Sequence, residues 1–477
     1  MERSASAVSN VRAMRGIVGW GTHLPHRRLD RAEIARFIGQ GGGKGTRTVA
    51  SYDEDPTTMA VEAARRAEGL AGIDLLLFAT TFPAYADKTN AAVVHAALRL
   101  ADGAAAIDLG QSMRSAMGGI LMAARSSGTV LVAAADIRTG LAGSAEESAG
   151  GDAGAATVVG DDSPDSPVLA EIVSTASATE EFVDRWRTPG ERRTKVWDER
   201  FAELTYGRLG QQAWTAALTS AGLSPTDIDV VAVCAPTARI GSSLAGRLGA
   251  VRVLDDMAVT VGNCGAAQPA LLLAALLEQA EPDQTVALVS LADGADVIVL
   301  RAAAGIAAHR SGRSVAEQVD AGAPISYGKF LSWRGSLEVE PPRRPEPSRV
   351  SATAAARSED WKFGFVASRD RETGQVFMPP QRVSADGART DAMDDQPMAD
   401  ARGTVATFTI DRVAYSPSPP IVFAVVDFDG GGRLPIELCD CDPDEVTIGM
   451  RVEPTFRRLY VQDGIPNYFW KARPIRG

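Results

Sequence analysis

Between residues 15 and 305, two hydrophobic patterns alternate along the chain. Short continuous apolar runs, "IDLLLFATTF" and "GTVLVAAADI", have the length and composition of strands that are buried on both faces. Longer segments with helical spacing lie between such runs, and "DPTTMAVEAARRAEGL" also has Asp55 as an N-cap and Pro56 in its first turn. This alternation predicts an α/β fold with helices packed on a largely parallel sheet.

The second part of this region repeats the order of the first. A predicted helix, "YGRLGQQAWTAALTSAGL", precedes the strand "IDVVAVCAPTA", and the helix "GNCGAAQPALLLAALLEQA" precedes the strands "QTVALVSLAD" and "ADVIVLRAA". The segments "AGIDLLLFATTF" and "TDIDVVAVCAPT" occupy equivalent places in the two parts. We therefore expect two duplicated halves, at residues 14–165 and 166–325.

The composition changes after residue 325. Residues 326–358 combine a short aromatic helix with a Pro-rich charged linker, "SYGKFLSWRGSLEVEPPRRPEP". Residues 359–477 then show short strands separated by turn signals, with "DFDGGG" as a strong hairpin sequence. Five or so short strands at this spacing predict a small all-β barrel as a C-terminal domain.

Charge and cysteine content narrow the class of protein. The formal net charge of -11 argues against a nucleic-acid-binding surface and against binding to an anionic membrane. Four cysteines are too few for a disulfide framework and fit a reducing cytoplasm. No apolar run reaches the ~20 residues of a membrane span. Residues 1–13 lack the apolar core of a signal peptide and are predicted to form a flexible N-terminus.

The segment "DLGQSMRSAMGG", residues 108–119, joins a predicted strand to a helix of small residues. Such a junction delivers a side chain to the mouth of a buried helix, which is where condensing enzymes hold a nucleophilic cysteine. Here the apex contains Ser112, Met113, Arg114 and Ser115, and no thiol.

Many segments together resemble the thiolase superfamily, in particular its hydroxymethylglutaryl-CoA synthase branch. The resemblance covers residues 14–325 and rests on "GIVGWGTHLPHRRL", "YDEDPTTMAVEAARRA", "AADIRTGLAGSAEE", "GDAGAATVVG", "RWRTPGER", "CAPTAR", "VGNCGAAQPALLLAALLE" and "ADGADVIVLR". It implies two βαβαβαββ halves layered α-β-α-β-α. Residues 355–477, with "GTVATFTI" and "CDPDEVTIGMRVEPTF", resemble the OB-fold domain that accompanies thiolase-like proteins and helps to bind acyl-CoA.

The same resemblance implies that the usual catalytic groups are replaced. The family's acyl-accepting cysteine falls on Met113, its histidine on Cys234, and its glutamate on Phe82 or a neighbour. A thioether cannot form an acyl thioester, and thioester exchange needs a thiolate beside a base. Asn263 is retained as a candidate oxyanion donor, so hydroxymethylglutaryl-CoA synthesis by the family mechanism is not expected.

Other residues near this junction leave alternatives open. Ser112 and Ser115 are either substitute nucleophiles or turn and helix-cap residues, and Arg114 either fills the pocket through a salt bridge or faces a thioester. Cys234 and Cys264 are either a pair of reactive thiols or small residues that fill an apolar site.

Two further side chains are candidates for binding and catalysis. Tyr85, on the loop after the strand that ends near Phe82, is a candidate base for a retro-aldol reaction, with loop packing as the alternative. Arg239 lies where the family places a cation that reaches the phosphates of coenzyme A, and a guanidinium suits that role.

No zinc site is predicted. Relatives of the OB-fold domain often carry a zinc ribbon with two pairs of cysteines, whereas "FGFVASRDRETGQVFMPPQRVSADG" contains none. Cys439 and Cys441 would need two more ligands and are expected to be core or surface thiols.

These observations favour a cytoplasmic, acyl-CoA-binding protein that resembles hydroxymethylglutaryl-CoA synthase and does not condense substrates itself. We expect a homodimer formed through the thiolase-like domain, a catalytic thiolase-type partner, and a coenzyme A thioester as substrate or ligand, without a covalently bound cofactor. The alternative is a carbon–carbon lyase or acyltransferase on acyl-CoA, of retro-aldol or Claisen type, that uses non-standard residues. A third hypothesis is a scaffold that only channels intermediates between partner proteins.

Overall fold

The computed structural model describes residues 14–309 and 313–476, so the predicted flexible N-terminus at residues 1–13 lies outside the described residues. Ten strands form one sheet in the order β12-β11-β13-β14-β8-β1-β7-β6-β4-β5. Five come from the first half: β1 (Arg15–His23), β4 (Ile73–Ala79), β5 (Ala105–Leu109), β6 (Thr129–Asp136) and β7 (Ala153–Asp161). Five come from the second: β8 (Ala170–Ala178), β11 (Val230–Cys234), β12 (Arg252–Val253), β13 (Thr285–Leu291) and β14 (Ala295–Ala302).

The two sets of strands are joined only at a short seam. There β1 pairs with β8 through Gly16 with Glu171 and Ile17 with Ala170. Each half follows the order βαβαβαββ once the short elements within residues 27–49, 145–149 and 185–196 are set aside. The duplication expected from the sequence is therefore present in the fold.

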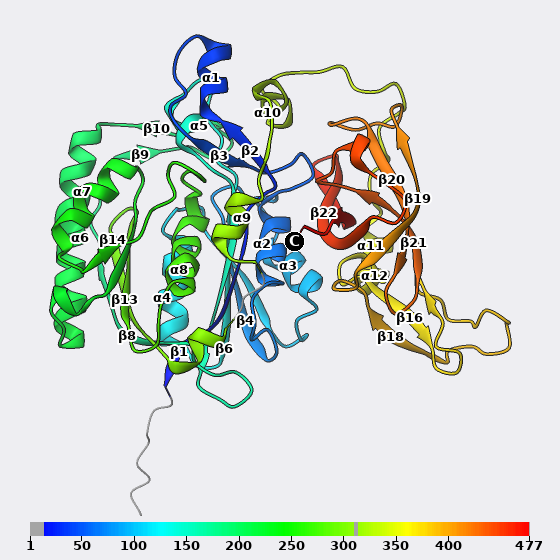
Figure 1. The fold of residues 1–477 in the computed structure, drawn as a ribbon, viewed down its shortest axis with the longest axis horizontal. Helices are drawn as coiled ribbons and strands as arrows, with labels where there is room; N and C mark the ends of the chain where they lie inside the picture. Colours follow the sequence, from blue (N-terminus) through cyan, green and yellow to red (C-terminus); the bar gives the residue numbers. More distant parts are fainter. Residues whose placement is uncertain (1–13, 310–312, 477) are drawn as a thin grey trace, which may run out of the picture.

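The helices and the two halves of the sheet form five layers (Figure 1). Helices α2 (Pro56–Ala64) and α3 (Ala91–Leu98) cover the outer face of the first half, and α6 (Glu199–Ala221) and α7 (Ala238–Leu248) that of the second. Between the halves lie α4 (Ser115–Arg125) and α8 (Gln268–Glu278). In α8 every residue from Gln268 to Leu277 is buried, as its central position requires. The predicted thiolase-like α-β-α-β-α architecture is confirmed.

Local sequence explains why α2 begins and packs as it does. The side chain of Asp55 accepts a hydrogen bond from the backbone N–H of Thr58, and Pro56 occupies the first turn. A Cβ on Gly154 or Gly21 would lie only 2.3 Å from a carbonyl oxygen of the α2 region, Met59 O or Ala63 O respectively. Glycines on β7 and β1 therefore allow the helix to lie close to the sheet.

Smaller elements cover the edges of this body. A three-stranded sheet is formed by β15 (Ala323–Pro324), β2 (Arg27–Asp30) and β3 (Thr46–Val49), and a two-stranded one by β9 (Arg185–Trp186) and β10 (Lys195–Val196). The remaining helices of the region are α1 (Arg31–Ile38), α5 (Ala145–Ala149), α9 (Val315–Asp320) and α10 (Tyr327–Trp333). In residues 14–309 and 313–476, no helix is long and apolar enough to cross a membrane.

The C-terminal region is a closed barrel, as the short strands predict. Its order is β19-β20-β21-β23-β22, formed by β19 (Gly403–Asp411), β20 (Ile421–Phe428), β21 (Arg433–Leu438), β22 (Arg451–Gln462) and β23 (Ile465–Pro474). The predicted hairpin turn joins β20 to β21, and its three glycines, 430–432, all have positive φ.

A second small sheet precedes the barrel. It consists of β17 (Val376–Phe377), β16 (Val366–Asp370) and β18 (Met393–Pro397), after the helices α11 (Ala352–Arg357) and α12 (Glu359–Lys362). In the part of the chain that the structure describes, no group of three or more His, Cys, Asp or Glu side chains is arranged to hold a metal ion.

A buried ionic cluster docks the barrel against the loop before α2. Lys471 Nζ lies 2.9 Å from Asp53 Oδ2 and 2.6 Å from Glu437 Oε1, and Arg457 Nη1 lies 2.7 Å from Glu54 Oε1. The side chains of Lys471, Arg457 and Asp53 are all 0% exposed. One apolar cluster also continues from the α2–α3 layer into the barrel core. The domains therefore form one body.

Replacing Asp53 by Asn should remove the one carboxylate that lies beside both buried cations, and only Glu437 would then remain next to the Lys471 ammonium. We expect a loss of about 3–5 kcal/mol in the free energy of unfolding, the usual result of breaking a buried pair from one side. Denaturant unfolding followed by tryptophan fluorescence measures this. The matched control is Glu180→Gln, which breaks the exposed pair with Arg208 and should cost below about 1 kcal/mol. If both variants lowered the free energy of unfolding equally, the buried cluster would not stabilise the fold more than an exposed ion pair does.

Candidate ligand cavity at the carboxyl ends of the strands

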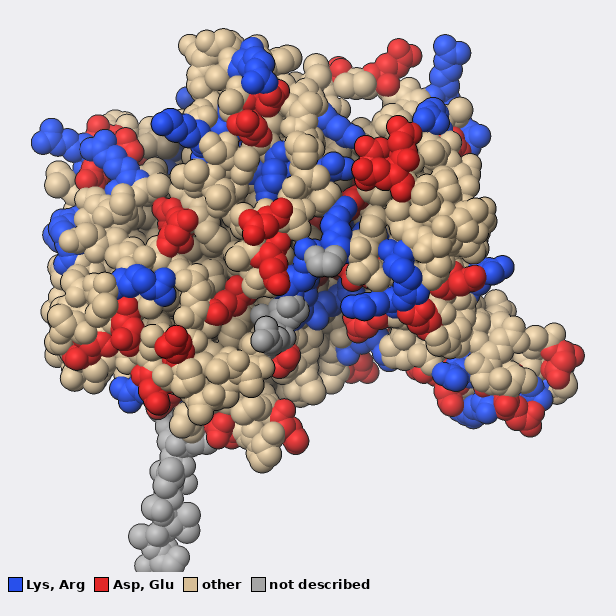
Figure 2. Space-filling model, in the orientation of Figure 1, with Lys and Arg blue, Asp and Glu red and all other residues tan. Residues whose placement is uncertain are grey.

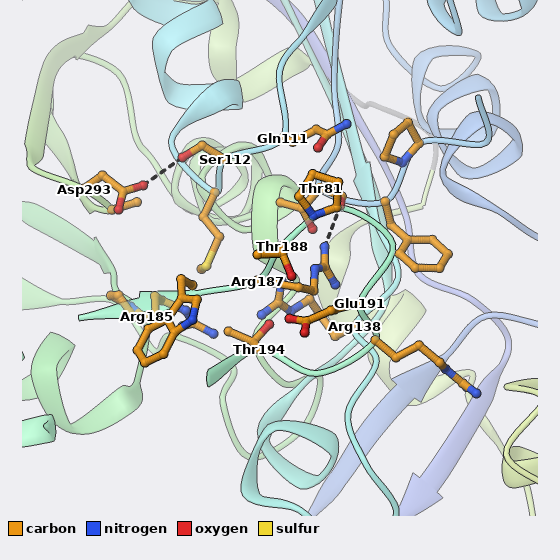
Figure 3. A pocket seen from close by; sticks show the side chains of 18 of the residues that line it. Thr81, Gln111, Ser112, Arg138, Arg185, Arg187, Thr188, Glu191, Thr194 and Asp293 are labelled. Atoms are coloured by element: carbon orange, nitrogen blue, oxygen red, sulfur yellow. Dashed lines mark hydrogen bonds between the residues drawn. The ribbon is translucent and has the colours of Figure 1, made fainter. Parts of the chain in front are cut away.

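A cavity of about 510 Å³ lies at the carboxyl ends of the parallel strands (Figure 3). Its walls come from the loops that follow β4, β5, β6 and β11, from the β13–β14 turn, and from residues 185–194. In open α/β sheets the carboxyl ends of the strands are where ligands bind. The lining includes Thr81, Phe82, Gln111, Ser112, Met113, Arg138, Arg185, Arg187, Glu191, Arg192, Thr194, Pro236 and Asp293.

Met113 stands at the apex of the β5–α4 turn and lines the cavity. Its neighbours are held by hydrogen bonds. Ser112 Oγ donates to Asp293 Oδ2 at 3.0 Å, and Ser115 Oγ donates to the carbonyl of Gly110. Arg114 donates to both oxygens of Asp296, at 2.7 and 2.8 Å. These bonds favour the turn-forming interpretation of the two serines and the salt-bridge interpretation of Arg114.

Phe82 also lines the cavity, beside a guanidinium. The Arg187 side chain lies 6.0 Å from the centre of the Phe82 ring and donates a 2.7 Å hydrogen bond to the carbonyl of Thr81. Tyr85 follows on the same loop but does not line the cavity. Its backbone N–H donates to Asn90 Oδ1, and burial, with a smaller effect of Asp55, raises the pKa of its phenol.

Asn263 and the two central cysteines, Cys234 and Cys264, do not line the cavity. The Asn263 side-chain amide donates to the carbonyls of Ala235 and Pro236, at 2.9 and 3.5 Å, and its Oδ1 accepts from the Gly265 N–H at 2.9 Å. Both cysteines are buried, and this burial raises the pKa of Cys234 from 9.0 to about 12 and raises that of Cys264 further. Such burial is typical of a cysteine that fills space in the apolar core and does not react.

Arg239 lies in the first turn of α7 and is largely exposed. Its guanidinium forms ion pairs with Glu203 at 3.1 Å and Glu199 at 3.8 Å on α6. Arg239 does not line the cavity.

Sequence reasoning missed the arginines that give the cavity its charge. Arg185 and Arg138 both contact Glu146; burial opposes ionisation of that carboxyl, but the two guanidinium groups hold its pKa below the usual range. Arg187 has no carboxylate within ion-pair distance among the described residues, and burial, then repulsion from Arg138, lowers its pKa. The closely spaced arginines of "RWRTPGERR" were the sequence signal that could have predicted a positively charged site. The cavity therefore carries excess positive charge.

The comparisons with known proteins agree with this architecture. The chain is 29% identical over 352 residues to the hydroxymethylglutaryl-CoA synthase of Archaeoglobus fulgidus, which covers 68% of the chain and 100% of that relative. Over 119 residues it is 28% identical to a "DUF35 domain-containing scaffold protein" of Methanocaldococcus jannaschii, covering 24% of the chain and 84% of that protein. The family described as "ChsH2, C-terminal OB-fold domain" matches residues 395–457.

Two solved structures share the fold of the larger domain. A hydroxymethylglutaryl-CoA synthase complexed with CoA has a TM-score of 0.58 at 20% identity and covers 67% of this chain and 90% of its own. A protein named MvaS, in complex with 3-hydroxy-3-methylglutaryl coenzyme A, has a TM-score of 0.59 at 19% identity, covering 72% and 95%. The protein has a thiolase-like α/β fold with a C-terminal OB-fold domain. Its homologues include hydroxymethylglutaryl-CoA synthases and a DUF35 scaffold protein.

Alkylation with iodoacetamide tests the state of the thiols. With a pKa of about 12, roughly one Cys234 side chain in ten thousand is a thiolate at pH 8. We expect Cys441, half-buried with a pKa of about 11, to react first, and Cys234 and Cys264 to react only after unfolding in urea. Mass spectrometry of peptides gives the order. Rapid labelling of Cys234 in the native protein would instead show that its thiol is accessible and reactive.

Proposed function

We propose that the chain binds an acyl-CoA in the cavity at the carboxyl ends of the strands and acts as a non-condensing subunit beside a thiolase-type partner. The observation that carries this proposal is the chemistry of the lining. Among the described residues that form the cavity, none is cysteine or histidine, and Met113 occupies the apex. A covalent acyl-enzyme needs a nucleophile with an adjacent base. The cavity offers space and cations without that pair.

The charge of the cavity supports a coenzyme A thioester as the ligand. Coenzyme A is a polyanion, and an arginine side chain pairs well with phosphate oxygens. Arg187 and Arg192 donate hydrogen bonds only to neutral groups among the described residues: Arg187 to the carbonyl of Thr81, Arg192 to the carbonyls of Arg334 and Gly335 and the hydroxyl of Ser336. Solved relatives of the same fold are described as complexes with CoA and with 3-hydroxy-3-methylglutaryl coenzyme A.

The fused barrel supports a role within a complex. Its relative in Methanocaldococcus jannaschii is described as a scaffold protein. In this chain the barrel is anchored to its own α/β body by the buried cluster around Lys471 and Arg457. A chain of this kind would present the thiolase-like body and the barrel to a partner as one preformed surface.

The candidate catalytic residues keep a supporting role in this proposal. Asn263 holds the loop after β11 through the carbonyls of Ala235 and Pro236. Tyr85 and Cys234 stand outside the lining, so a lyase using them would require the loop after β4 or the end of β11 to move. Turnover of an acyl-CoA by the isolated chain would favour that alternative.

Filling the cavity should weaken acyl-CoA binding. In Met113→Trp the indole would occupy space at the apex, and we expect the Kd for acetyl-CoA and for a longer acyl-CoA to rise by about tenfold or more in calorimetry. Intact-protein mass spectrometry should show no acyl adduct on the wild-type chain.

The control is Ile448→Trp, which adds an indole at an exposed isoleucine in the C-terminal barrel region and should leave the Kd unchanged. A stable adduct on Cys234, Cys264 or Ser115 would overturn the non-condensing assignment. If the wild-type chain bound no acyl-CoA at all, the proposal that acyl-CoA is the ligand would be wrong.

The free edge of the sheet supports the proposed dimer. Strand β5 ends the strand order and pairs only with β4 among the described strands. Ile107 on β5 is 48% exposed. Met122 on α4 is 53% exposed and lines an open hollow together with Leu109, Leu121 and three glycines, and the lining also includes Arg114, Arg125 and Asp296. Exposed edge strands with apolar side chains are sites for pairing with another chain. We propose that β5 pairs across a two-fold axis with a second copy.

Ile107→Lys should place an ammonium on that edge and separate the dimer. The expected result is a halved mass in size-exclusion chromatography with light scattering, at an unchanged far-UV circular dichroism spectrum. Val461→Lys, at an exposed apolar position on the barrel, is the control and should keep the wild-type mass. A wild-type chain that is already monomeric at high concentration would contradict the proposed second copy.

A further inference from the structure

A second concave site lies where the α/β body meets the barrel, and we call it the junction groove. It has a volume of about 380 Å³ and lies between the end of α2, the segment before β19 and strands β22 and β23. Figure 2 shows Lys and Arg side chains gathered at this junction. Six arginines line the groove: Arg65, Arg66, Arg313, Arg402, Arg473 and Arg476.

Two of these arginines are fixed by carboxylates. Arg473 Nη1 lies 3.1 Å from Glu62 Oε2, and its Nε lies 2.9 Å from Glu453 Oε1. Arg65 pairs with Glu62 at 2.8 Å and with Asp400 at 2.9 Å. These contacts hold both sides of the groove, because Glu62 belongs to α2 and Arg473 to the barrel. The shape of the groove is therefore fixed by ion pairs between the two domains.

Three other arginines face the groove without such a partner. Arg66 donates to the carbonyl of Thr22 at 2.6 Å and to Gln318 Oε1 at 2.8 Å, and Arg476 donates to the carbonyl of Asp440. Arg402 is exposed. Within residues 14–309 and 313–476, no carboxylate forms an ion pair with Arg66, Arg402 or Arg476. Their charges are concentrated on one concave surface.

The surroundings of Arg66 and Arg476 make an added anion favourable. Burial, and then repulsion from Arg473, lowers the pKa of Arg66 from 12.5 to about 10. Burial also lowers the pKa of Arg476, with repulsion from Arg473 and Arg27 acting in the same direction against the attraction of Asp440. Buried cations of like sign repel one another, and an anion between them relieves both the repulsion and the desolvation.

We propose that the junction groove is a binding site for a phosphate or pyrophosphate group of a small molecule. A guanidinium donates two parallel hydrogen bonds to phosphate oxygens, and several guanidinium groups around one cavity match an anion of more than one charge. The groove shares no lining residue with the cavity at Met113, so this site is separate from the proposed acyl-CoA site. Its two walls belong to different domains, so the bound anion contacts both.

Calorimetry on the full chain with inorganic pyrophosphate, in a phosphate-free buffer at low salt, tests this inference. We expect one site per chain on the wild type and about tenfold weaker binding for Arg402→Gln and for Arg476→Gln, since each removes a charged hydrogen-bond donor. The matched control is Arg412→Gln, an exposed arginine on the turn after β19 outside the groove, which should stay within about twofold of the wild type.

Three results would overturn the proposal: no binding of pyrophosphate by the wild type, equal weakening by Arg412→Gln, or loss of binding in Met113→Trp. Thermal unfolding checks that the variants fold. Arg402→Gln carries the test if Arg476→Gln does not fold, because the exposed Arg402 side chain forms no hydrogen bond or ion pair with the described residues. Inorganic phosphate and coenzyme A are titrated as further arms. A second coenzyme A site that Arg402→Gln removes would identify a nucleotide as the source of the phosphate, whereas binding of inorganic phosphate alone would identify the free anion.

Discussion

The buried ionic cluster between the loop before α2 and the barrel is the constraint on which the arrangement of the whole molecule depends. Arg457 lies among Glu54, Asp440 and Asp53, and Lys471 lies between Asp53 and Glu437. A buried charge is tolerable only beside its partners, so separating the domains would expose or unpair several charges at once. The barrel is therefore held at a fixed place against α2.

This fixed contact also shapes the sites. Glu62 on α2 accepts a 3.0 Å hydrogen bond from the backbone N–H of Phe456 on β22, and Tyr468 donates a 2.8 Å hydrogen bond to Asp55, which is also the N-cap of α2. The helix that closes one side of the junction groove thus begins and ends in contact with the barrel. An apolar interface alone would leave the relative orientation less strictly defined, because hydrophobic burial is not directional.

Much of the fold could be predicted from the sequence because the relevant signals are local. Apolar runs such as 73–82 and capping residues such as Asp55 and Pro56 determine elements within a few residues of themselves, and the structure places a strand and a helix there. The ionic cluster could not be predicted, because Asp53 and Lys471 are about four hundred positions apart and charged residues usually lie on the surface. The same holds for the cavity, whose cations come from separate loops around Arg138 and Arg187.

The apex at Met113 shows how the β5–α4 turn keeps its shape independently of the side chain at position 113. The turn is held by its flanking residues: Ser112 bonds Asp293 and Arg114 bonds Asp296, and both carboxylates belong to the second half of the sheet. These bonds join the two halves across the cavity, and the side chain at position 113 contributes none of them. The constraint that preserves the junction is thus the connection between the halves, and it acts on the neighbours of Met113. The shape of the turn at the cavity therefore depends on Ser112 and Arg114, and the Met113 side chain makes none of the bonds that hold it.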